Sequence, residues 1–374
     1  SVRATDMAAR DTQNNDTSLA RLGGDEFTIM LSGLNGLDHV ELVAQRILER
    51  ICQPLKLSGN RVTISASIGI SIYPEDGKDL DTLLKHADTA MYEVKAKGRN
   101  GIFFYDDRLR QQSQDRLQLE SELHEALEQD QMSLFYQPKV DTQTQEILGL
   151  EALIRWIHPD KGMISPMDFI PVAEESGQII SMGKWVIRAA CRQHQAWCEA
   201  GLAPVSISVN LSGHQFADEQ LLAAIEDILK ETDMRAEYLE FEITETVLMQ
   251  DADAALNILN QMKAMGLKIS IDDFGTGYSS ISYLKHFPVD VLKIDRAFVK
   301  DLPEDEQDAT ITSAIIMLAK ALNLVVVAEG VETAEQLQWM QERGCEQIQG
   351  YLFSPPLPAD KLMPMLGKPI VINH

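Results

Sequence analysis

The chain has 374 residues, of which 57 are acidic and 33 are basic, so its formal net charge at pH 7 is −24. A protein that wraps duplex nucleic acid needs clustered Lys and Arg to neutralise phosphates, so this charge argues against a nucleic acid polymer as partner. Hydrophobic residues make up 45% of the chain, which argues against general disorder. The length suits two domains, or one barrel-sized domain and a smaller module.

The sequence contains neither a membrane segment nor a signal peptide that we can identify. No apolar run approaches the roughly 18 residues of a spanning helix. The four cysteines form no C-x-x-C pair, so we interpret them as reduced thiols of a cytoplasmic protein. The chain begins at Ser1, in what reads as the tail of a helix, which suggests a longer parent protein. That parent could be anchored at the cytoplasmic face of the inner membrane, which is an alternative that the sequence leaves open.

Residues 1–105 alternate short strands and helices. The pattern predicts a turn at residues 23–26, a strand over 27–31, a helix over 38–53, a strand over 62–73 and a helix over 79–97. These elements amount to about half of an α+β domain. Residues 106–130 carry Leu119, Leu123 and Leu127 at helical spacing among charged residues, which predicts a linker helix with one buried stripe.

Residues 131–374 carry eight short apolar runs that are mostly separated by helical patterns. The predicted strands are 133–139, 147–153, 205–209, 239–243, 267–271, 291–294, 324–328 and 348–352. The predicted helices are 182–199, 217–232, 251–265, 308–322 and 334–343. This α/β arrangement predicts a TIM-type (β/α)8 barrel. Only residues 140–146 separate the first two strands, too few for a parallel crossover, so this pair should be antiparallel.

Polar side chains interrupt the apolar runs where seven of these strands end. They are Glu151, Asn210, Glu242, Asp272 with Asp273, Lys293, Glu329 and Gln349. Any one alone is better read as a strand-end residue facing water, but all of them together indicate an active site at the carboxyl ends of the strands. Carboxylates gathered at one mouth repel each other unless cations lie between them. Oxygen ligands favour Mg²⁺ or Mn²⁺, and two such ions roughly 3.5–4 Å apart suit water attack on a phosphodiester.

These residues lie within short motifs. The motifs are Tyr136-Gln137-Pro138, Glu151-Ala152-Leu153-Ile154-Arg155-Trp156, Val209-Asn210-Leu211-Ser212, Glu242-Ile243-Thr244-Glu245, Asp272-Asp273-Phe274-Gly275-Thr276-Gly277-Tyr278-Ser279-Ser280, Lys293-Ile294-Asp295, Ala328-Glu329-Gly330-Val331-Glu332 and Gln349-Gly350-Tyr351. With them, residues 132–366 resemble the EAL domain, a family of cyclic di-GMP phosphodiesterases. The resemblance implies a barrel that binds two Mg²⁺ or Mn²⁺ ions and opens cyclic di-GMP to linear pGpG.

The same resemblance implies a role for each motif residue. It makes Glu151, Asn210, Glu242 and Asp272 ligands of one metal, and Asp272 and Asp273 ligands of the second. It makes Lys293 the group that positions the attacking water or the phosphate, and Glu329 a base or a second-metal ligand. The implied substrate contacts are Gln137, Leu153, Arg155, Asn210, Asp273 and Gln349. Glu245 resembles the anchor of a mobile loop at residues 275–277, which in the family couples homodimerisation of the barrel to metal binding.

Residues 1–105 carry the turn Gly23, Gly24, Asp25, Glu26 and Phe27. With the segments 87–92 and 97–100, they resemble the second half of a GGDEF domain, which cyclises GTP. The first half, with a further acidic metal ligand, is absent, so we expect a scaffold or a regulator that senses a nucleotide such as GTP. The letters of the family's inhibitory site occur at Arg3-Ala4-Thr5-Asp6, but they lie too far upstream of the turn for us to expect a working site.

The sequence therefore predicts a metal-dependent cyclic di-GMP phosphodiesterase. One alternative is a receptor that binds cyclic di-GMP without cutting it; such receptors are expected to lack several metal ligands, whereas this sequence keeps them. The other alternative is a bifunctional cyclase and phosphodiesterase in the full-length parent.

Overall fold

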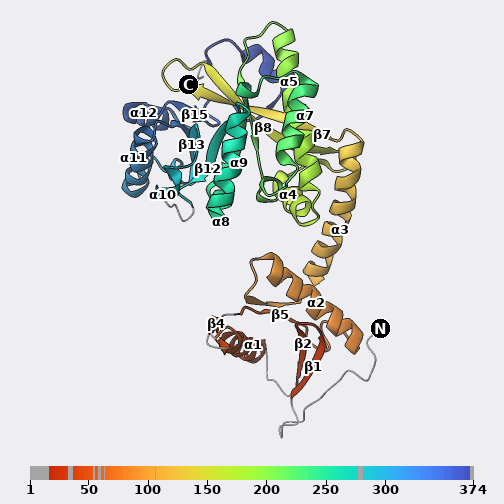
Figure 1. The fold of residues 1–374 in the computed structure, drawn as a ribbon. Helices are drawn as coiled ribbons and strands as arrows, with labels where there is room; N and C mark the ends of the chain where they lie inside the picture. Colours follow the sequence, from red (N-terminus) through yellow and green to blue (C-terminus); the bar gives the residue numbers. More distant parts are fainter. Residues whose placement is uncertain are drawn as a thin grey trace. The chain divides into compact units, whose positions relative to one another are not determined.

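A computed structural model of the chain describes residues 17–32, 37–53, 55–57, 60–62, 64–105, 107–276 and 281–370. The segments Arg3–Asp6 and Gly277–Ser280, which figure in the sequence analysis, lie outside these residues. The chain forms two compact units, Ser1–Leu117 and Gln118–His374 (Figure 1). The domain boundaries that we predict, at residues 105 and 130, stay a prediction.

The first unit is built from short strands and two helices. Its elements are β1 (Thr17–Gly23), β2 (Glu26–Leu31), α1 (Leu37–Ile51), β3 (Leu55–Leu57), β4 (Asn60–Val62), β5 (Ser67–Ile70), α2 (Leu80–Ala96) and β6 (Gly101–Phe104). The Asp79 side chain caps α2 by accepting a hydrogen bond from the backbone N–H of Thr82, which explains why the helix begins there.

The single strand predicted over residues 62–73 is wrong. Strand β4 pairs antiparallel with β3, and β5 pairs parallel with β6. The two strands have different partners, and the described residues between them, 64–66, belong to no strand. Apolar residues occur on both sides of this break, which is why the sequence pattern reads as continuous.

A helix, α3 (Asp107–Glu128), lies where we predict the linker helix, and its role as a linker stays a prediction. Within the second unit, Leu123 and Ala126 are fully buried against Trp156 and Phe169. The outer face of the same turn is tied by Glu122, whose carboxylate accepts a hydrogen bond from Lys161 at 2.6 Å. The last turns of α3 are therefore packed against the barrel through a second, smaller apolar cluster.

The second unit contains the predicted barrel. Among the described residues, the strands that close the ring are β7 (Met132–Asp141), β8 (Ile147–His158), β10 (Ser206–Asn210), β11 (Leu239–Thr244), β12 (Lys268–Phe274), β13 (Val291–Ile294), β14 (Val325–Glu329) and β15 (Gln347–Gln349), in this order around the ring. Two short strands, β9 (Gly162–Ile164) and β16 (Leu357–Pro358), extend it by pairing with β8 and β7. Strand β7 is antiparallel to both neighbours in the ring, which confirms the predicted antiparallel first pair.

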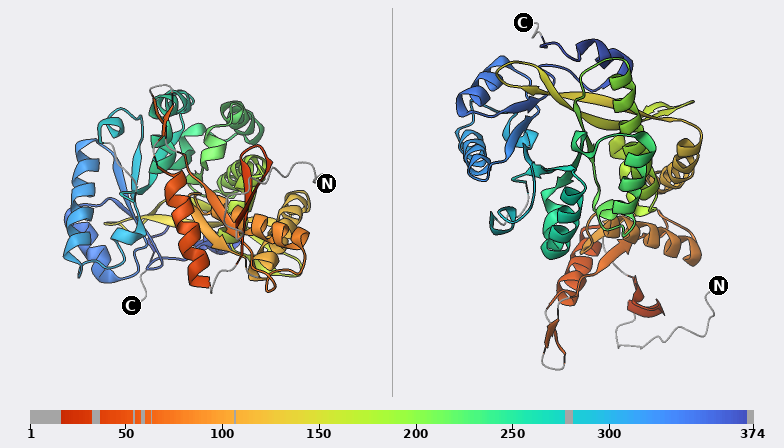
Figure 2. Two further views of the ribbon diagram at one scale, coloured as in Figure 1. Left: turned by 90° about the horizontal axis from the view of Figure 1, so that it is seen from below. Right: turned by 45° about the horizontal axis from the view of Figure 1, so that its top comes forward.

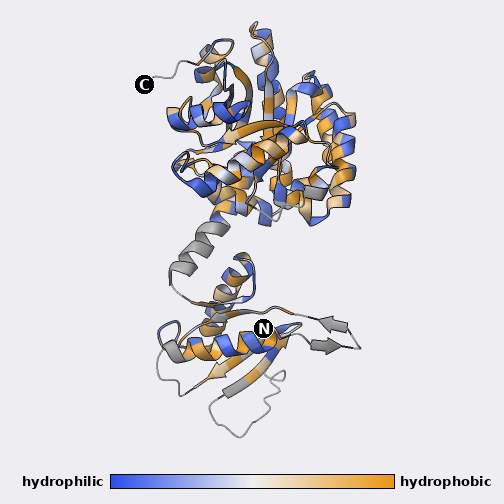
Figure 3. Ribbon diagram, turned by 90° about the vertical axis from the view of Figure 1, so that its left-hand side faces the viewer, coloured by the Kyte–Doolittle hydropathy of each residue, from blue (hydrophilic) through white to orange (hydrophobic). Residues whose placement is uncertain are grey.

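Helices lie outside the ring of strands (Figures 1 and 2). They are α4 (Pro166–Glu175), α5 (Ile179–Glu199), α6 (Gly213–Phe216), α7 (Leu221–Thr232), α8 (Glu245–Gln250), α9 (Ala252–Ala264), α10 (Ile281–Leu284), α11 (Glu306–Ala321), α12 (Ala334–Arg343) and α13 (Ala359–Leu362). The barrel strands are largely hydrophobic, and the helices carry hydrophobic and hydrophilic residues along their length (Figure 3). Alternate residues such as Val209, Phe241 and Ile243 are buried in the large apolar core, which leaves the intervening positions to line the inside of the barrel.

No helix in the described part of the chain is long and apolar enough to cross a bilayer. The cytoplasmic location that we expect from the sequence stays a prediction. All four cysteines lie within the described residues and are free thiols, with Cys191 and Cys345 buried.

Candidate active site

The register of the parallel strands brings the predicted strand-end residues to one mouth. Asn210 of β10 lies beside Glu242 of β11, and Glu329 of β14 lies beside Gln349 of β15. Gln137 belongs to the reversed strand β7, yet it lies directly opposite Glu151 of β8. The ring therefore presents one continuous set of polar groups toward its interior.

Lys293 lies at the centre of this set. Its side chain is 1% exposed, and its Nζ approaches carboxylate oxygens of four different strands: Glu242 at 2.5 Å, Glu329 at 2.5 Å, Asp272 at 3.1 Å and Glu151 at 3.8 Å. Burial alone would lower the pKa of a lysine, but these carboxylates raise the pKa of Lys293 well above its usual value. Lys293 is therefore a buried ammonium ion held by a ring of acids.

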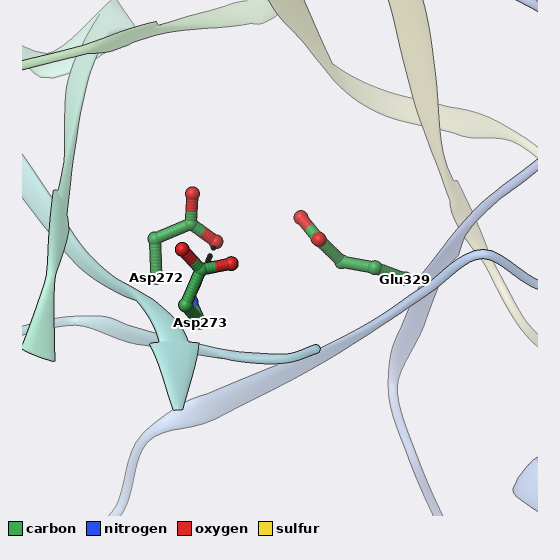
Figure 4. A group of neighbouring side chains, drawn as sticks. All are labelled: Asp272, Asp273 and Glu329. Carbon is green, nitrogen blue, oxygen red and sulfur yellow. Dashed lines mark hydrogen bonds between the residues drawn. The ribbon is translucent and has the colours of Figure 1, made fainter. Parts of the chain in front are cut away.

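Asp272, Asp273 and Glu329 form a cluster of three carboxylates at the mouth. Each offers a carboxylate oxygen within 4.8 Å of the others, and Figure 4 shows Glu329 pointing from β14 toward the two aspartates at the end of β12. Asp273 has a left-handed backbone, with φ of 52°, and its N–H donates to Oδ1 of Asp272 at 3.0 Å. This turn brings two consecutive carboxylates to the same opening, which an extended strand would place on opposite faces.

Amide side chains orient Glu151. Asn210 Nδ2 donates to Oε1 of Glu151 at 2.7 Å, and Gln349 Nε2 donates to Oε2 at 2.5 Å. Gln349 Nε2 also donates to Oε1 of Gln137 at 3.0 Å, and the buried Oε1 of Gln349 has no hydrogen-bond partner in the described part of the chain. These residues form a network, so a change at one of them will move the others.

The surroundings raise the pKa of some carboxylates of the site and lower the pKa of another. Burial, together with repulsion from Asp272 and Glu151, raises the pKa of Glu329 to about 8, although Lys293 opposes the shift. Burial and the adjacent Asp272 raise the pKa of Asp273 to about 6. Burial acts in the same direction on Glu242, but Lys139 and Lys293 outweigh it and lower its pKa. The negative charge of Glu242 is thus the one best balanced by nearby ammonium groups, whereas the charge of Glu329 is poorly balanced.

The structure shows two charged groups that the sequence analysis missed. Lys139 of β7 and Glu240 of β11 are buried inside the barrel, and Lys139 Nζ donates to Glu240 at 2.8 Å and to Glu242 at 2.7 Å. Glu240 precedes Glu242 by two residues, a spacing that places both on one face of the strand and could have drawn attention to it.

The charge of the donor set fits divalent cations. Among the described residues around the mouth and the interior beneath it, carboxylates outnumber ammonium groups. Lys139 and Lys293 are the ammonium groups, and the carboxylates are those of Glu151, Glu240, Glu242, Asp272, Asp273, Asp295 and Glu329. With all of these groups ionised, an excess of five negative charges is left, which divalent cations at the mouth would reduce. Oxygen donors of this kind suit Mg²⁺ or Mn²⁺.

The remaining predicted residues lie around this centre. Leu153 and Arg155 follow Glu151 on β8 and are half-buried, and the Arg155 guanidinium lies 5.7 Å from the ring centre of Phe135. Glu245 is buried; its Oε2 accepts a hydrogen bond from the N–H of Gly275 at 3.2 Å, while its Oε1 has no hydrogen-bond partner among the residues that the structure describes. This contact ties the start of the predicted loop to α8, and Gly277 lies outside the described residues.

The predicted GGDEF turn belongs to the first unit. Residues 23–27 lie at the junction of β1 and β2 and are exposed, and Arg21 Nε donates to the carbonyl oxygen of Gly24 at 3.0 Å. Asp25 and Glu26 therefore share no strand with the acids of the barrel.

Comparisons with known proteins agree with this description. The model of the EAL domain matches residues 120–356, and that of the diguanylate cyclase GGDEF domain matches residues 5–101. The chain is 46% identical over 362 residues to a bifunctional diguanylate cyclase/cyclic di-GMP phosphodiesterase, MucR, of Pseudomonas aeruginosa, covering 97% of this chain and 52% of the relative. It is 38% identical over 358 residues to the cyclic di-GMP phosphodiesterase PdeR of Escherichia coli, covering 96% of this chain and 54% of that protein.

A solved structure described as the PaMucR phosphodiesterase in complex with c-di-GMP is 48% identical, with a TM-score of 0.64, and the match covers 66% of this chain and 99% of that one. The chain spans about half the length of the curated relatives described above. The fold, the site and both domain matches show that the chain belongs to the EAL-domain family and carries a GGDEF-domain segment ahead of its barrel.

Proposed function

We propose that this chain hydrolyses one phosphodiester bond of cyclic di-GMP and releases linear pGpG. The observation that carries the proposal is the ring of carboxylates from β8, β11, β12 and β14 around Lys293. Such a concentration of acidic groups suits a site that binds divalent cations and a phosphate. The relatives named as cyclic di-GMP phosphodiesterases, and the related structure with c-di-GMP bound, support this substrate.

The reaction breaks one P–O3′ bond and forms a bond between phosphorus and a water oxygen, leaving a 5′-phosphate and a 3′-hydroxyl. Two Mg²⁺ or Mn²⁺ ions would supply charge neutralisation of the phosphate and a lower pKa for water. Glu151, Asn210, Glu242 and Asp272 would be ligands of one ion, and Asp272 and Asp273 ligands of the other.

The chain's own residues then position the reactants and accept the proton of the attacking water, which the 3′-oxygen takes up when the P–O3′ bond breaks. Lys293 stabilises the charge that grows on the phosphoryl oxygens, because its ammonium is already fixed by buried carboxylates and needs no reorganisation. Glu329 takes the proton of the attacking water or contributes a ligand to the second ion. Gln137, Leu153, Arg155 and Gln349 contact the dinucleotide, and Glu245 fixes the loop that begins at Gly275.

The first test incubates the chain with cyclic di-GMP and Mg²⁺, with Mn²⁺, or with excess chelator, and identifies the product by chromatography and mass spectrometry. We expect pGpG with either metal and unchanged substrate in chelator. Binding without turnover at saturating Mg²⁺ would establish the alternative, a cyclic di-GMP receptor.

Two partner assignments belong to this proposal. We propose a homodimer through the barrel, which sedimentation of the chain at several concentrations tests directly.

We also propose that the GGDEF segment is a scaffold or a GTP sensor without cyclase activity. Addition of GTP should therefore give no cyclic di-GMP, and any effect of GTP should appear as a change in the rate of pGpG release.

A further inference from the structure

The inside of the barrel contains a buried ion cluster beneath the mouth. Lys139 is 3% exposed, Glu240 4% and Glu242 1%, and Lys139 Nζ contacts a carboxylate oxygen of each. The interior layers of such barrels are ordinarily filled with Val, Ile and Leu. This interior is charged at a place that bulk water does not reach.

The strand register explains how a lysine crosses the barrel. Lys139 pairs with Gly149 across the antiparallel β7–β8 ladder, and a Cβ at Gly149 would come within 3.8 Å of Cδ of Lys139. That distance is an ordinary van der Waals contact, and the closest neighbours of the Cβ would be O and Oγ of Ser206, at 3.3 Å. The lysine stem therefore passes beside Gly149 without a clash. Lys139 therefore reaches β11, a strand that is not its neighbour in the ring.

Lys139 occupies one particular oxygen of Glu242. Oε1 of Glu242 accepts from Lys139 Nζ at 2.7 Å, whereas Oε2 accepts from Lys293 Nζ at 2.5 Å. Oε2 thus faces the centre of the acidic ring, and Oε1 is directed to the interior beneath it. Lys139 also donates to Oε1 of Glu240 at 2.8 Å, which fixes the ammonium from a second side.

Stability alone does not account for this arrangement. Replacing a buried ion pair by well-packed apolar residues of similar volume is often neutral or stabilising. The cluster touches a proposed metal ligand, so it is better explained by the geometry it imposes on that ligand.

We propose that Lys139 is a positioning residue: it holds Oε1 of Glu242 in the interior beneath the mouth, so that Glu242 can offer a cation only Oε2, the oxygen that also contacts Lys293, and it thereby favours Mg²⁺ over Ca²⁺. Mg²⁺ requires near-octahedral geometry with few carboxylate oxygens, whereas Ca²⁺ accepts six to eight oxygens and bidentate carboxylates. Release of Oε1 would let Glu242 bind through both oxygens and would improve the site for Ca²⁺. This inference rests on the proposed two-cation site.

The test compares two variants that differ only at Lys139. Glu240→Gln keeps Lys139 beside Glu242, and Lys139→Met/Glu240→Gln removes it. The double variant loses one buried charge of each sign and replaces the pair with side chains of similar length, so it should fold even where Lys139→Met alone does not. Isothermal titration with MgCl₂ and with CaCl₂, in the absence of nucleotide, gives the two dissociation constants of each protein.

We expect Glu240→Gln to keep the ratio of Mg²⁺ to Ca²⁺ affinity of the unmodified chain. The double variant should shift that ratio toward Ca²⁺, by up to the roughly 10–100-fold by which removal of a hydrogen-bond partner of a metal ligand changes metal affinity. An unchanged ratio in the double variant would overturn the inference and reduce Lys139 to a structural countercharge. If the unmodified chain binds neither ion, the proposed function fails first, and the two failures are thereby distinguished.

Discussion

Lys293 Nζ lies 2.5 Å from Oε1 of Glu329, the residue that ends the neighbouring strand β14. The same ammonium also contacts Glu242. A single lysine therefore joins Glu242, whose pKa is lowered, to Glu329, whose pKa is raised. Bound cations and Lys293 would therefore neutralise the same excess of negative charge. This relationship makes Lys293 the residue whose replacement separates catalysis from binding most clearly.

Replacement of Lys293 by Met, which keeps the length of the side chain, should lower saturated turnover by roughly 10²–10³-fold, as is usual for loss of one preorganised electrostatic contact. Dinucleotide affinity should change much less, because Arg155, Gln349 and the cations share it. The affinity of both proteins is measured by titration with cyclic di-GMP in Ca²⁺. A hundredfold loss of affinity with unchanged turnover would make Lys293 a substrate anchor instead.

Exchange of Mg²⁺ for Ca²⁺ should abolish hydrolysis while leaving cyclic di-GMP bound. Ca²⁺ has longer bonds and a looser coordination geometry, which misplace the attacking water relative to the phosphate. Product formation is followed by chromatography during titration of Ca²⁺ into the Mg²⁺ reaction. Rapid turnover in Ca²⁺ alone would contradict the geometric account of the site.

The substitution Glu151→Ala should abolish turnover, because it removes a proposed metal ligand and leaves Asn210 and Gln349 without their shared acceptor. Asp25→Ala is the matched control. It removes an exposed carboxylate in the first unit and should leave phosphodiester cleavage nearly intact. Equal losses of activity in the two variants would show that the two motifs do not work separately.

Gly350→Ala should destabilise the barrel. A Cβ at Gly350 would collide with the backbone nitrogen and oxygen of Val331, whose N–H donates to the Gln349 carbonyl at 3.2 Å. Overpacking against a backbone of this kind typically costs about 1–3 kcal/mol of unfolding free energy. The same change at Gly23, where a Cβ would meet nothing within 4 Å, should cost less than about 0.5 kcal/mol.

Chemical denaturation of both glycine variants, followed by circular dichroism, gives the comparison. Cyclic di-GMP affinity should also fall in Gly350→Ala, because the collision displaces the adjacent Gln349. A barrel that tolerates alanine at residue 350 with unchanged affinity would show that Val331 can move freely.

The sequence was sufficient to predict the barrel, its antiparallel first pair and the polar residues at its mouth. These features follow from local patterns. A seven-residue connection is too short for a parallel crossover, and a polar residue directly after an apolar run marks the end of a strand. Strand β8 illustrates the limit of this reasoning. It continues to His158, beyond the predicted end at residue 153, because β9 and α3 cover the additional residues.

The ion cluster of Lys139 and Glu240 could not be predicted in the same way. Lys139 meets β11, which is separated from it by about 100 residues and by two intervening strands of the ring. A pattern of alternating residues identifies the inward face of each strand but does not say which inward residues meet across the barrel. The break in the strand predicted over residues 62–73 has a similar origin, since pairing partners are not encoded in the local pattern.

The central claim, attack of water on phosphorus within the carboxylate ring, is tested most directly by hydrolysis of cyclic di-GMP in H₂¹⁸O with Mg²⁺. Mass spectrometry of the product should show pGpG with one ¹⁸O atom, located on the 5′-phosphate. Glu151→Ala provides the background under the same conditions. Product without the label, label on a ribose hydroxyl, or intact bound cyclic di-GMP would contradict the account.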